Sequence, residues 1–171
     1  MKRFHVIFCF LVAVFLFSSC GYHLSGYGSS LPAHIRSISI PVFKNFSSEP
    51  NIQRGVTDAV RRAFISDGRL KVADAKKADL LIQGTLTDYQ LRAVAFNSED
   101  SVAEYIVRIG VQITAYNRIK KKIIFDQKFT NQWNYRATAS VVDSQLERLS
   151  ALREAYEDLA DTLVSITIEQ F

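Results

Sequence analysis

The sequence predicts an α+β fold, a two-layer sandwich in which a mixed four-stranded sheet is covered on one face by two helices. Apolar and polar residues alternate, as in strands with one buried face, in four segments: 38–42, 80–87, 104–115 and 123–130. Apolar residues recur at helical spacing in two further segments, 52–64 and 146–166. Because a sheet that is apolar on one face needs a cover, the two one-sided helices are expected to supply it.

The first strand is predicted around Ile38, Ile40 and Val42, which alternate with Ser39 and Pro41. Pro41 cannot donate a hydrogen bond to a neighbouring strand, so this strand is expected at an edge of the sheet or to end there. A helix follows it before the next strand. The connection from strand through helix to strand is therefore expected to cross over in the right-handed sense.

The first helix is predicted to begin after Ser47 and Ser48, close to Pro50, because these residue types favour helix starts. Its apolar stripe contains Ile52, Val56, Ala59, Val60, Ala63 and Phe64. Gly68 is expected to end it, since glycine readily adopts the left-handed conformation that follows a helix. The segment 70–72 is either a short strand or an extended connector.

The remaining three strands form the main part of the predicted sheet. A turn at 117–121 joins the last two strands into a hairpin, and 94–101 is expected to be a polar loop. Asp143 can cap the final helix, whose stripe of mostly leucine residues continues to Ile166. We expect one α+β domain over 34–171, without an internal repeat.

The N-terminal segment has the pattern of a bacterial lipoprotein signal peptide. Lys2 and Arg3 precede an apolar run at 6–17, and two serines then lead to Cys20. We expect 1–19 to be removed and Cys20 to carry a diacylglycerol and an N-acyl chain. The glycine- and serine-rich segment 20–33 then holds the lipidated cysteine and a flexible tether. An ordinary secreted protein and an uncleaved anchor are the alternatives.

The amino-acid composition limits the classes of partner that the chain is expected to bind. The chain has 21 Lys and Arg residues and 17 Asp and Glu residues, and removal of Lys2 and Arg3 leaves a net charge of +2. This excess is too small for a general nucleic-acid binder, so no nucleic-acid partner is expected. Cys9 belongs to the signal segment and Cys20 to the lipid anchor. The domain is therefore expected to depend on its core rather than on disulfides.

The residues that carry chemistry do not predict an enzyme. No glycine-rich phosphate loop precedes a helix, and there is no Gly-x-Ser-x-Gly elbow. Only His23 and His34 would remain in the mature chain, and both lie near the tether. No ligand spacing for zinc is present. We expect a binding or assembly module without a metal and without a cofactor other than the lipid on Cys20.

Basic and aromatic residues lie close together on and around the strands. The basic residues predicted to bind the head group of a phosphorylated amphiphile are Arg92, Arg108, Arg136, Lys120, Lys121 and Lys122. The aromatic residues predicted to contact a partner are Tyr89, Phe96, Trp133 and Tyr135. Arginine and lysine bind phosphate groups, so this combination suits an amphiphile with a phosphorylated head group. The alternative is a solvated sheet face whose charges serve solubility.

Several stretches, in order along the chain, resemble the LPS-assembly lipoprotein LptE family. They are CGYHL at 20–24, LP at 31–32, ISIP at 38–41, FISDGRLKV at 64–72, ADLLIQG at 78–84 and EYIV at 104–107. The resemblance covers essentially the whole chain. It implies a two-helix, four-stranded sandwich and an outer-membrane lipoprotein that plugs the lumen of the β-barrel LptD and helps to insert lipopolysaccharide into the outer leaflet.

The resemblance also implies site residues. In the family, a loop between the middle strands and basic residues near strand ends are implicated in contacts with the barrel and with lipopolysaccharide. Phe96 matches the aromatic residue of that loop, and Asn97 replaces the basic residue that follows it in the enterobacterial form. Arg136 lies roughly where a second basic residue of the family falls.

The predicted function is that of an outer-membrane lipoprotein on the periplasmic side that plugs and assists the assembly of LptD and binds lipopolysaccharide. Gly21, rather than Asp, follows Cys20, which favours sorting to the outer membrane. The alternative is a lipoprotein subunit of another envelope or secretion complex that makes protein contacts only. The same scaffold serves both functions, so the fold does not separate them.

Overall fold

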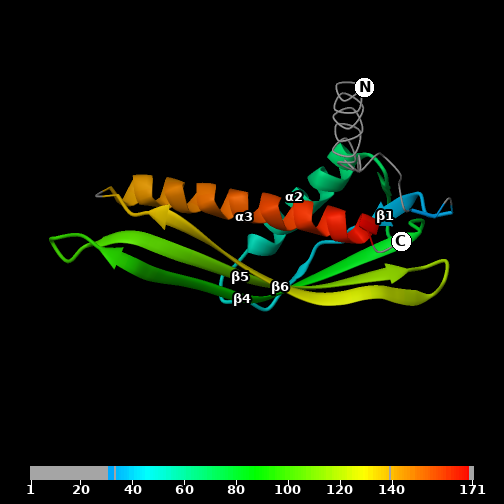
Figure 1. The fold of residues 1–171 in the computed structure, drawn as a ribbon, viewed down its shortest axis with the longest axis horizontal. Coiled ribbons are helices and arrows are strands. Elements are labelled where there is room, and N and C mark those ends of the chain that lie inside the picture. Colours follow the sequence, from blue (N-terminus) through cyan, green and yellow to red (C-terminus); the bar gives the residue numbers. More distant parts are fainter. Residues whose placement is uncertain (1–30, 33, 139, 170–171) are drawn as a thin grey trace, which may run out of the picture.

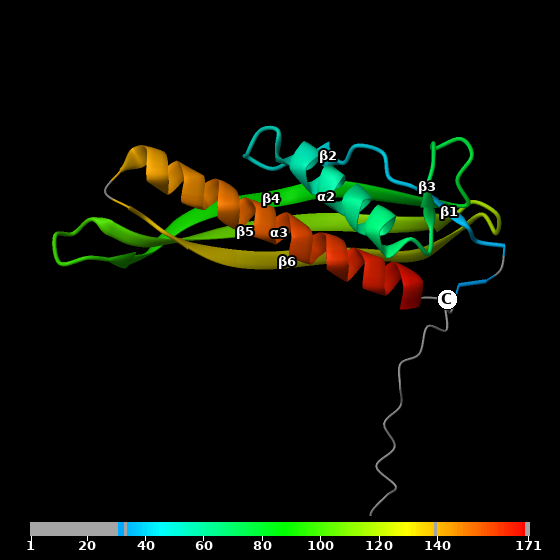
Figure 2. The ribbon, with the colours of Figure 1, turned by 90° about the horizontal axis from the view of Figure 1, so that it is seen from above.

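The computed structural model describes residues 31–32, 34–138 and 140–169. The predicted signal peptide, Cys20 and most of the tether lie outside the described residues. The elements in chain order are β1 (Ser37–Ser39), β2 (Lys44–Asn45), α2 (Ile52–Asp67), β3 (Lys71–Val72), β4 (Leu80–Phe96), β5 (Val102–Asn117), β6 (Lys122–Arg136) and α3 (Val141–Glu169). Both helices lie on one side of the sheet, which confirms the predicted α+β two-layer architecture (Figures 1 and 2).

The sheet is mixed, but it has six strands rather than the predicted four. Its order is β3-β1-β4-β5-β6, and β2 pairs separately with β4. β1 is parallel to β3 and β4, whereas β4, β5 and β6 form an antiparallel meander. The two additional strands, β2 and β3, have only two residues each. A two-residue segment cannot show an alternating pattern. For this reason the sequence did not predict β2, and it left 70–72, which contains β3, as either a short strand or a connector.

The three long strands extend beyond the predicted segments. β4 continues to Phe96, so the loop predicted at 94–101 is reduced to 97–101. A register shift between Leu86 and Asp88 interrupts the alternation, and this break hides the second half of β4 in the sequence. The turn at 97–101 is held locally: Asn97 Oδ1 accepts the backbone N–H groups of Glu99 and Ser101, both at 2.9 Å.

The helix boundaries follow from local chemistry. α2 ends at Gly68, as predicted: its φ is 73° and its N–H donates to the Phe64 carbonyl at 3.2 Å. α3 begins two residues before the predicted cap, Asp143. Ser140 lies before the helix, and its Oγ accepts the Asp143 N–H at 3.3 Å. The capping residue is therefore Ser140, and Asp143 lies in the first turn, where its charge favours the helix dipole.

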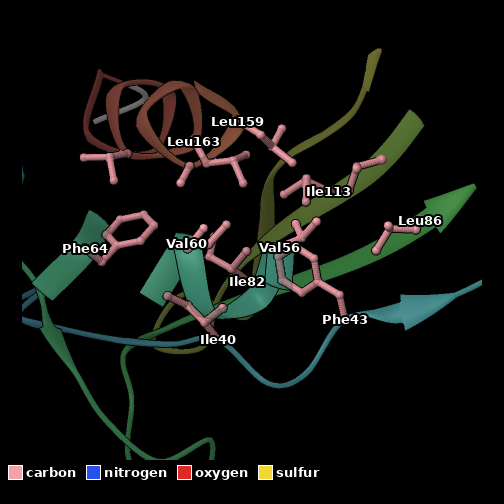
Figure 3. Packing of buried hydrophobic residues seen from close by; sticks show 14 of the residues in the cluster. Ile40, Phe43, Val56, Val60, Phe64, Ile82, Leu86, Ile113, Leu159 and Leu163 are labelled. Carbon is pink, nitrogen blue, oxygen red and sulfur yellow. The ribbon is translucent and has the colours of Figure 1, made fainter. Parts of the chain in front are cut away.

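The core lies between the sheet and the two helices (Figure 3). Side chains of α2 and α3 meet those of the central strands there, and Val56, Val60, Phe64, Ile82, Ile113 and Leu163 are fully buried. The Phe43 ring packs directly on the backbone of β4 at Gly84, where a Cβ would overlap the ring. This close approach requires glycine at position 84 and lets the segment after β1 close the core.

Candidate binding surfaces

The sheet face that the helices leave uncovered carries three arginines on three adjacent strands. Arg92 of β4 lies opposite Ile106, and Arg108 of β5 lies opposite Gln90 and Gln132. Arg136 of β6 lies opposite Glu104. All three are exposed, and all belong to the half of the sheet near the 97–101 turn. We call Arg92, Arg108 and Arg136 the distal arginine surface.

Two of these three arginines form no ion pair with another described residue. Arg108 Nε lies 4.0 Å from Asp88 Oδ2, so it is weakly paired. Glu104 Oε1 accepts a 2.8 Å hydrogen bond from Asn134 Nδ2 rather than pairing with Arg136. Among the described residues, Arg92 and Arg136 have no ion-pair partner. The distal arginine surface therefore keeps donors for an anionic group from outside.

Lys120, Lys121 and Lys122 do not belong to this surface. They lie at the turn between β5 and β6, where Asn117 Oδ1 accepts the Lys120 N–H at 2.9 Å and Lys121 has a φ of 52°. Thirteen register positions separate Asn117 from Glu104, which corresponds to about 40 Å along the strand. The six basic residues grouped by the sequence are thus divided between the β5–β6 turn and the half of the sheet near the 97–101 turn.

The four aromatic residues also differ in their positions. Phe96 is 62% exposed beside the 97–101 turn, whereas Tyr89 and Tyr135 are buried on the helix side of the sheet. Tyr135 stacks on Tyr105 with a centroid distance of 5.3 Å. Trp133 is half-buried, and its Nε1 donates to Asp158 Oδ2 of α3 at 2.8 Å. Tyr89, Tyr135 and Trp133 therefore join the sheet to α3, and their role in partner binding stays a prediction.

A polar network that the sequence does not reveal links the loop before α2, β4 and α3. Arg148 Nη2 lies 2.5 Å from Glu49 Oε1 and donates to Tyr89 Oη at 2.9 Å. Burial acts to lower the pKa of Arg148, but these partners outweigh it and hold the guanidinium charged. Nearby, burial raises the pKa of Tyr156 to about 12, so its ring stays neutral. The network positions α3 over the sheet and leaves no open site.

The cavity between α3 and β6 is too small for a lipid chain. This cavity, lined by Val111, Phe129 and Leu159 among others, measures about 10 Å³, which is about the space of one water molecule. No group of three His, Cys, Asp or Glu side chains that could hold a metal occurs in the described part of the chain. Ligands are therefore expected on the surface rather than between the layers.

The sequence comparison decides the family. A family model described as LptE, lipopolysaccharide-assembly, matches residues 35–165. The chain belongs to the LptE family. This confirms the resemblance found in the sequence, together with the prediction that the chain is a non-enzymatic lipoprotein of lipopolysaccharide assembly that works with the transport machinery. No curated protein matches the LptE-family chain significantly.

Solved structures of distant relatives share the fold. Rare lipoprotein B from Shewanella oneidensis is 17% identical, with 73% of this chain and 92% of that chain covered and a TM-score of 0.53. A minor lipoprotein from Acinetobacter baumannii is 16% identical, with 80% and 92% covered and a TM-score of 0.53. A protein from Xanthomonas campestris is 13% identical, with 82% and 88% covered and a TM-score of 0.55. These similarities show that the fold is shared with these proteins.

Family membership places the chain among envelope lipoproteins. In the described part of the chain, neither helix is both long enough and apolar enough to span a bilayer.

Proposed function

We propose that this LptE-family chain is anchored on the periplasmic side of the outer membrane through acyl chains on Cys20. There it plugs the LptD barrel, assists its assembly and binds lipopolysaccharide during insertion into the outer leaflet. Family membership supports the LptD role. The lipopolysaccharide role rests on one observation, the distal arginine surface, where Arg92 and Arg136 lie on the bare sheet face without an ion pair to another described residue.

The chemistry of this surface fits a phosphorylated head group. Guanidinium groups bind phosphate through two parallel N–H donors, which gives both affinity and orientation. The cavity between α3 and β6, at about 10 Å³, is too small for an acyl chain. We therefore expect the protein to hold the head group while the acyl chains stay outside the domain.

The shape of the domain supports the barrel role. β4, β5 and β6 form a long meander with one bare face, and the 97–101 turn extends beyond the helices (Figures 1 and 2). Phe96 exposes its ring beside that turn, and β6 is an edge strand. A long, mostly polar face with an aromatic tip suits contact with the wall of a barrel lumen.

The lipopolysaccharide role is tested with the double variant Arg92→Glu, Arg136→Glu. At low salt we expect affinity for lipopolysaccharide to fall by roughly tenfold or more, because each exposed charge contact contributes up to about 1 kcal/mol and reversal adds repulsion. The difference should shrink at high salt, since exposed charges are screened. The control, Arg54→Glu with Arg62→Glu, makes the same charge change on exposed positions of α2. Unchanged binding of the first variant at both salt concentrations would refute the assignment.

The LptD role is tested by isolating the tagged chain from detergent-extracted outer membranes and identifying what remains bound. We expect LptD in stoichiometric amount, with the Phe96→Ala variant recovering less of it. Recovery of a different envelope complex without LptD would instead favour the alternative of a subunit with protein contacts only.

A further inference from the structure

Three segments from distant parts of the chain meet at the end of the sheet opposite the distal arginine surface. Asp79 Oδ2 accepts the backbone N–H groups of Arg36 at 2.9 Å and Ser37 at 3.0 Å, and the Ser37 hydroxyl at 2.8 Å. The Asp79 carbonyl accepts the Arg118 N–H at 2.9 Å, and the Arg118 guanidinium contacts the Ala75 carbonyl. The start of the domain, the turn before β4 and the β5–β6 turn are thus held together.

This junction concentrates positive charge. We call it the basic end, and its basic residues are Arg36, Lys76, Lys77, Arg118, Lys120, Lys121 and Lys122. The five lysines are exposed, and none of them forms an ion pair with another described residue. Among the acidic residues around this end, Asp79 is occupied by its hydrogen bonds, Asp74 lies in the turn before β4, and Asp126 lies further along β6, opposite Thr114. An open groove of about 510 Å³ at the same end adds Arg61 and Lys71 to its lining.

Apolar side chains flank the three consecutive lysines. Ile119 is 50% exposed and Ile123 is 56% exposed. Ile123 lies opposite Tyr116, which lies opposite Leu81, so a small apolar strip crosses the bare sheet face at this end. Single exposed apolar residues are ordinary, but here two isoleucines bracket a run of lysines on one turn. This combination suits a surface with anionic groups above an apolar layer.

We propose that the basic end is a membrane-docking surface that binds the anionic head groups of phospholipids, with Ile119 and Ile123 directed toward the acyl boundary. The proposal rests on the acyl anchor at Cys20. Cys20 precedes Leu31 by eleven positions, and a chain of that length spans at most about 40 Å when fully extended. An anchor at Cys20 therefore limits the distance from the bilayer surface to Leu31 to about 40 Å, and charge complementarity would bring the basic end, rather than the distal one, into contact with it.

The basic end carries mainly lysines, whereas the distal surface carries arginines, and these two residue types suit different ligands. Lysine is a compact point charge on a flexible stem, which suits head groups that move laterally in a bilayer. Each lysine near an anionic leaflet strengthens binding by a factor of roughly five. The distal arginine surface, with planar donors on rigid strands, instead suits one oriented ligand. The two ends thus bind different lipids.

The test uses the mature lipidated protein purified from envelopes and reconstituted into vesicles of phosphatidylcholine, with or without one-third phosphatidylglycerol. Hydrogen exchange is measured at 118–123. We expect exchange there to slow several-fold in the anionic vesicles only, and to recover at high salt. The variant Lys120→Gln, Lys121→Gln, Lys122→Gln should lose this protection. The control Arg54→Gln, Arg62→Gln, Lys128→Gln also removes three positive charges, but elsewhere on the domain. It should keep the protection of 118–123 from exchange.

The other outcomes are distinguishable. If the protein floats with both kinds of vesicle and 118–123 exchanges equally in both, docking is refuted while the anchor stands. If it floats with neither, the anchor itself is refuted, and docking falls with it. If detergent-dispersed lipopolysaccharide protects 118–123 and anionic vesicles do not, the turn is a lipopolysaccharide site and the proposal is overturned.

Discussion

A single carboxylate, that of Asp79, determines how the domain begins. It accepts three hydrogen bonds from Arg36 and Ser37 and so fixes β1 beside β4. Burial acts to raise the pKa of Asp79, but these hydrogen bonds and the nearby His34 outweigh it, so the pKa is lowered. Because the folded state favours the ionised form, the carboxylate stabilises the fold above the unfolded pKa of about 3.9.

We therefore expect Asp79→Asn to lower the free energy of unfolding at pH 7 by about 1.5–3 kcal/mol, the range for hydrogen bonds to a charged group. The difference from the wild type should shrink as the pH falls through the lowered pKa of Asp79, because the wild-type carboxyl then becomes neutral. Urea unfolding of both proteins at pH 7 and pH 3 measures this difference in the free energy of unfolding. Glu157→Gln, on the exposed face of α3, is the control and should change little. An equal loss at both pH values would contradict the charge-based explanation.

At the scale of elements, the hydrophobic periodicity of the sequence predicted the helices and strands that face the core. The stripe on α2, the stripe on α3 from Leu152 onward and the alternation of β4 and β5 are the patterns that burial against one shared core imposes, and the structure confirms them. Leu146 and Leu149 at the start of α3 are instead exposed, and so is Ile123, which follows a register shift beside Ala115. The strands that hydrophobic periodicity did not predict were missed for local reasons. The shift at Leu86 and Asp88 breaks the alternation of β4, and β2 and β3 are too short to show one.

The arrangement of the binding residues could be predicted less well, because it depends on long-range pairing. Closeness in sequence grouped Lys120 with Arg108, but the antiparallel register carries the β5–β6 turn to the far end of the sheet. Similarly, Glu49 and Arg148 are 99 residues apart, and no local pattern connects them. Composition identifies which residues can bind phosphate, and only the topology shows which of them lie together.

The placement of α3 depends on the network of Glu49, Tyr89 and Arg148. We expect Arg148→Met to lower the free energy of unfolding by about 2 kcal/mol, because it leaves the half-buried Glu49 and the Tyr89 hydroxyl without their partner. A double-mutant cycle with Tyr89→Phe should give a coupling energy of about 1 kcal/mol. Arg153→Met, exposed on the same helix, is the control and should change stability by less than about 0.5 kcal/mol. Additive effects of the two changes would show that the hydrogen bonds do not couple.

On the scale of the whole molecule, the long meander separates two basic regions by about 40 Å, which is more than the thickness of a bilayer's hydrocarbon core. One region lies where the chain enters the domain, and the other lies near the 97–101 turn (Figures 1 and 2). With the entry end held at the membrane surface, the distal arginine surface can reach a site far from the anchor. Under the two proposals made above, membrane attachment belongs to one end of the domain and ligand contact to the other.

The lipid on Cys20 and the contact with the LptD barrel are both expected to hold the protein at the outer membrane. An experiment can separate these two contributions. We replace 1–19 with a cleavable secretory signal and introduce Cys20→Ala, so that the exported chain carries no lipid. With LptD present, the variant should remain largely in the outer-membrane fraction, because the barrel contact alone retains it. When LptD is depleted, it should move to the periplasmic fraction, whereas the lipidated wild type should stay with the membrane. Release of the variant even with LptD present would show that the lipid, not the barrel, is the main attachment.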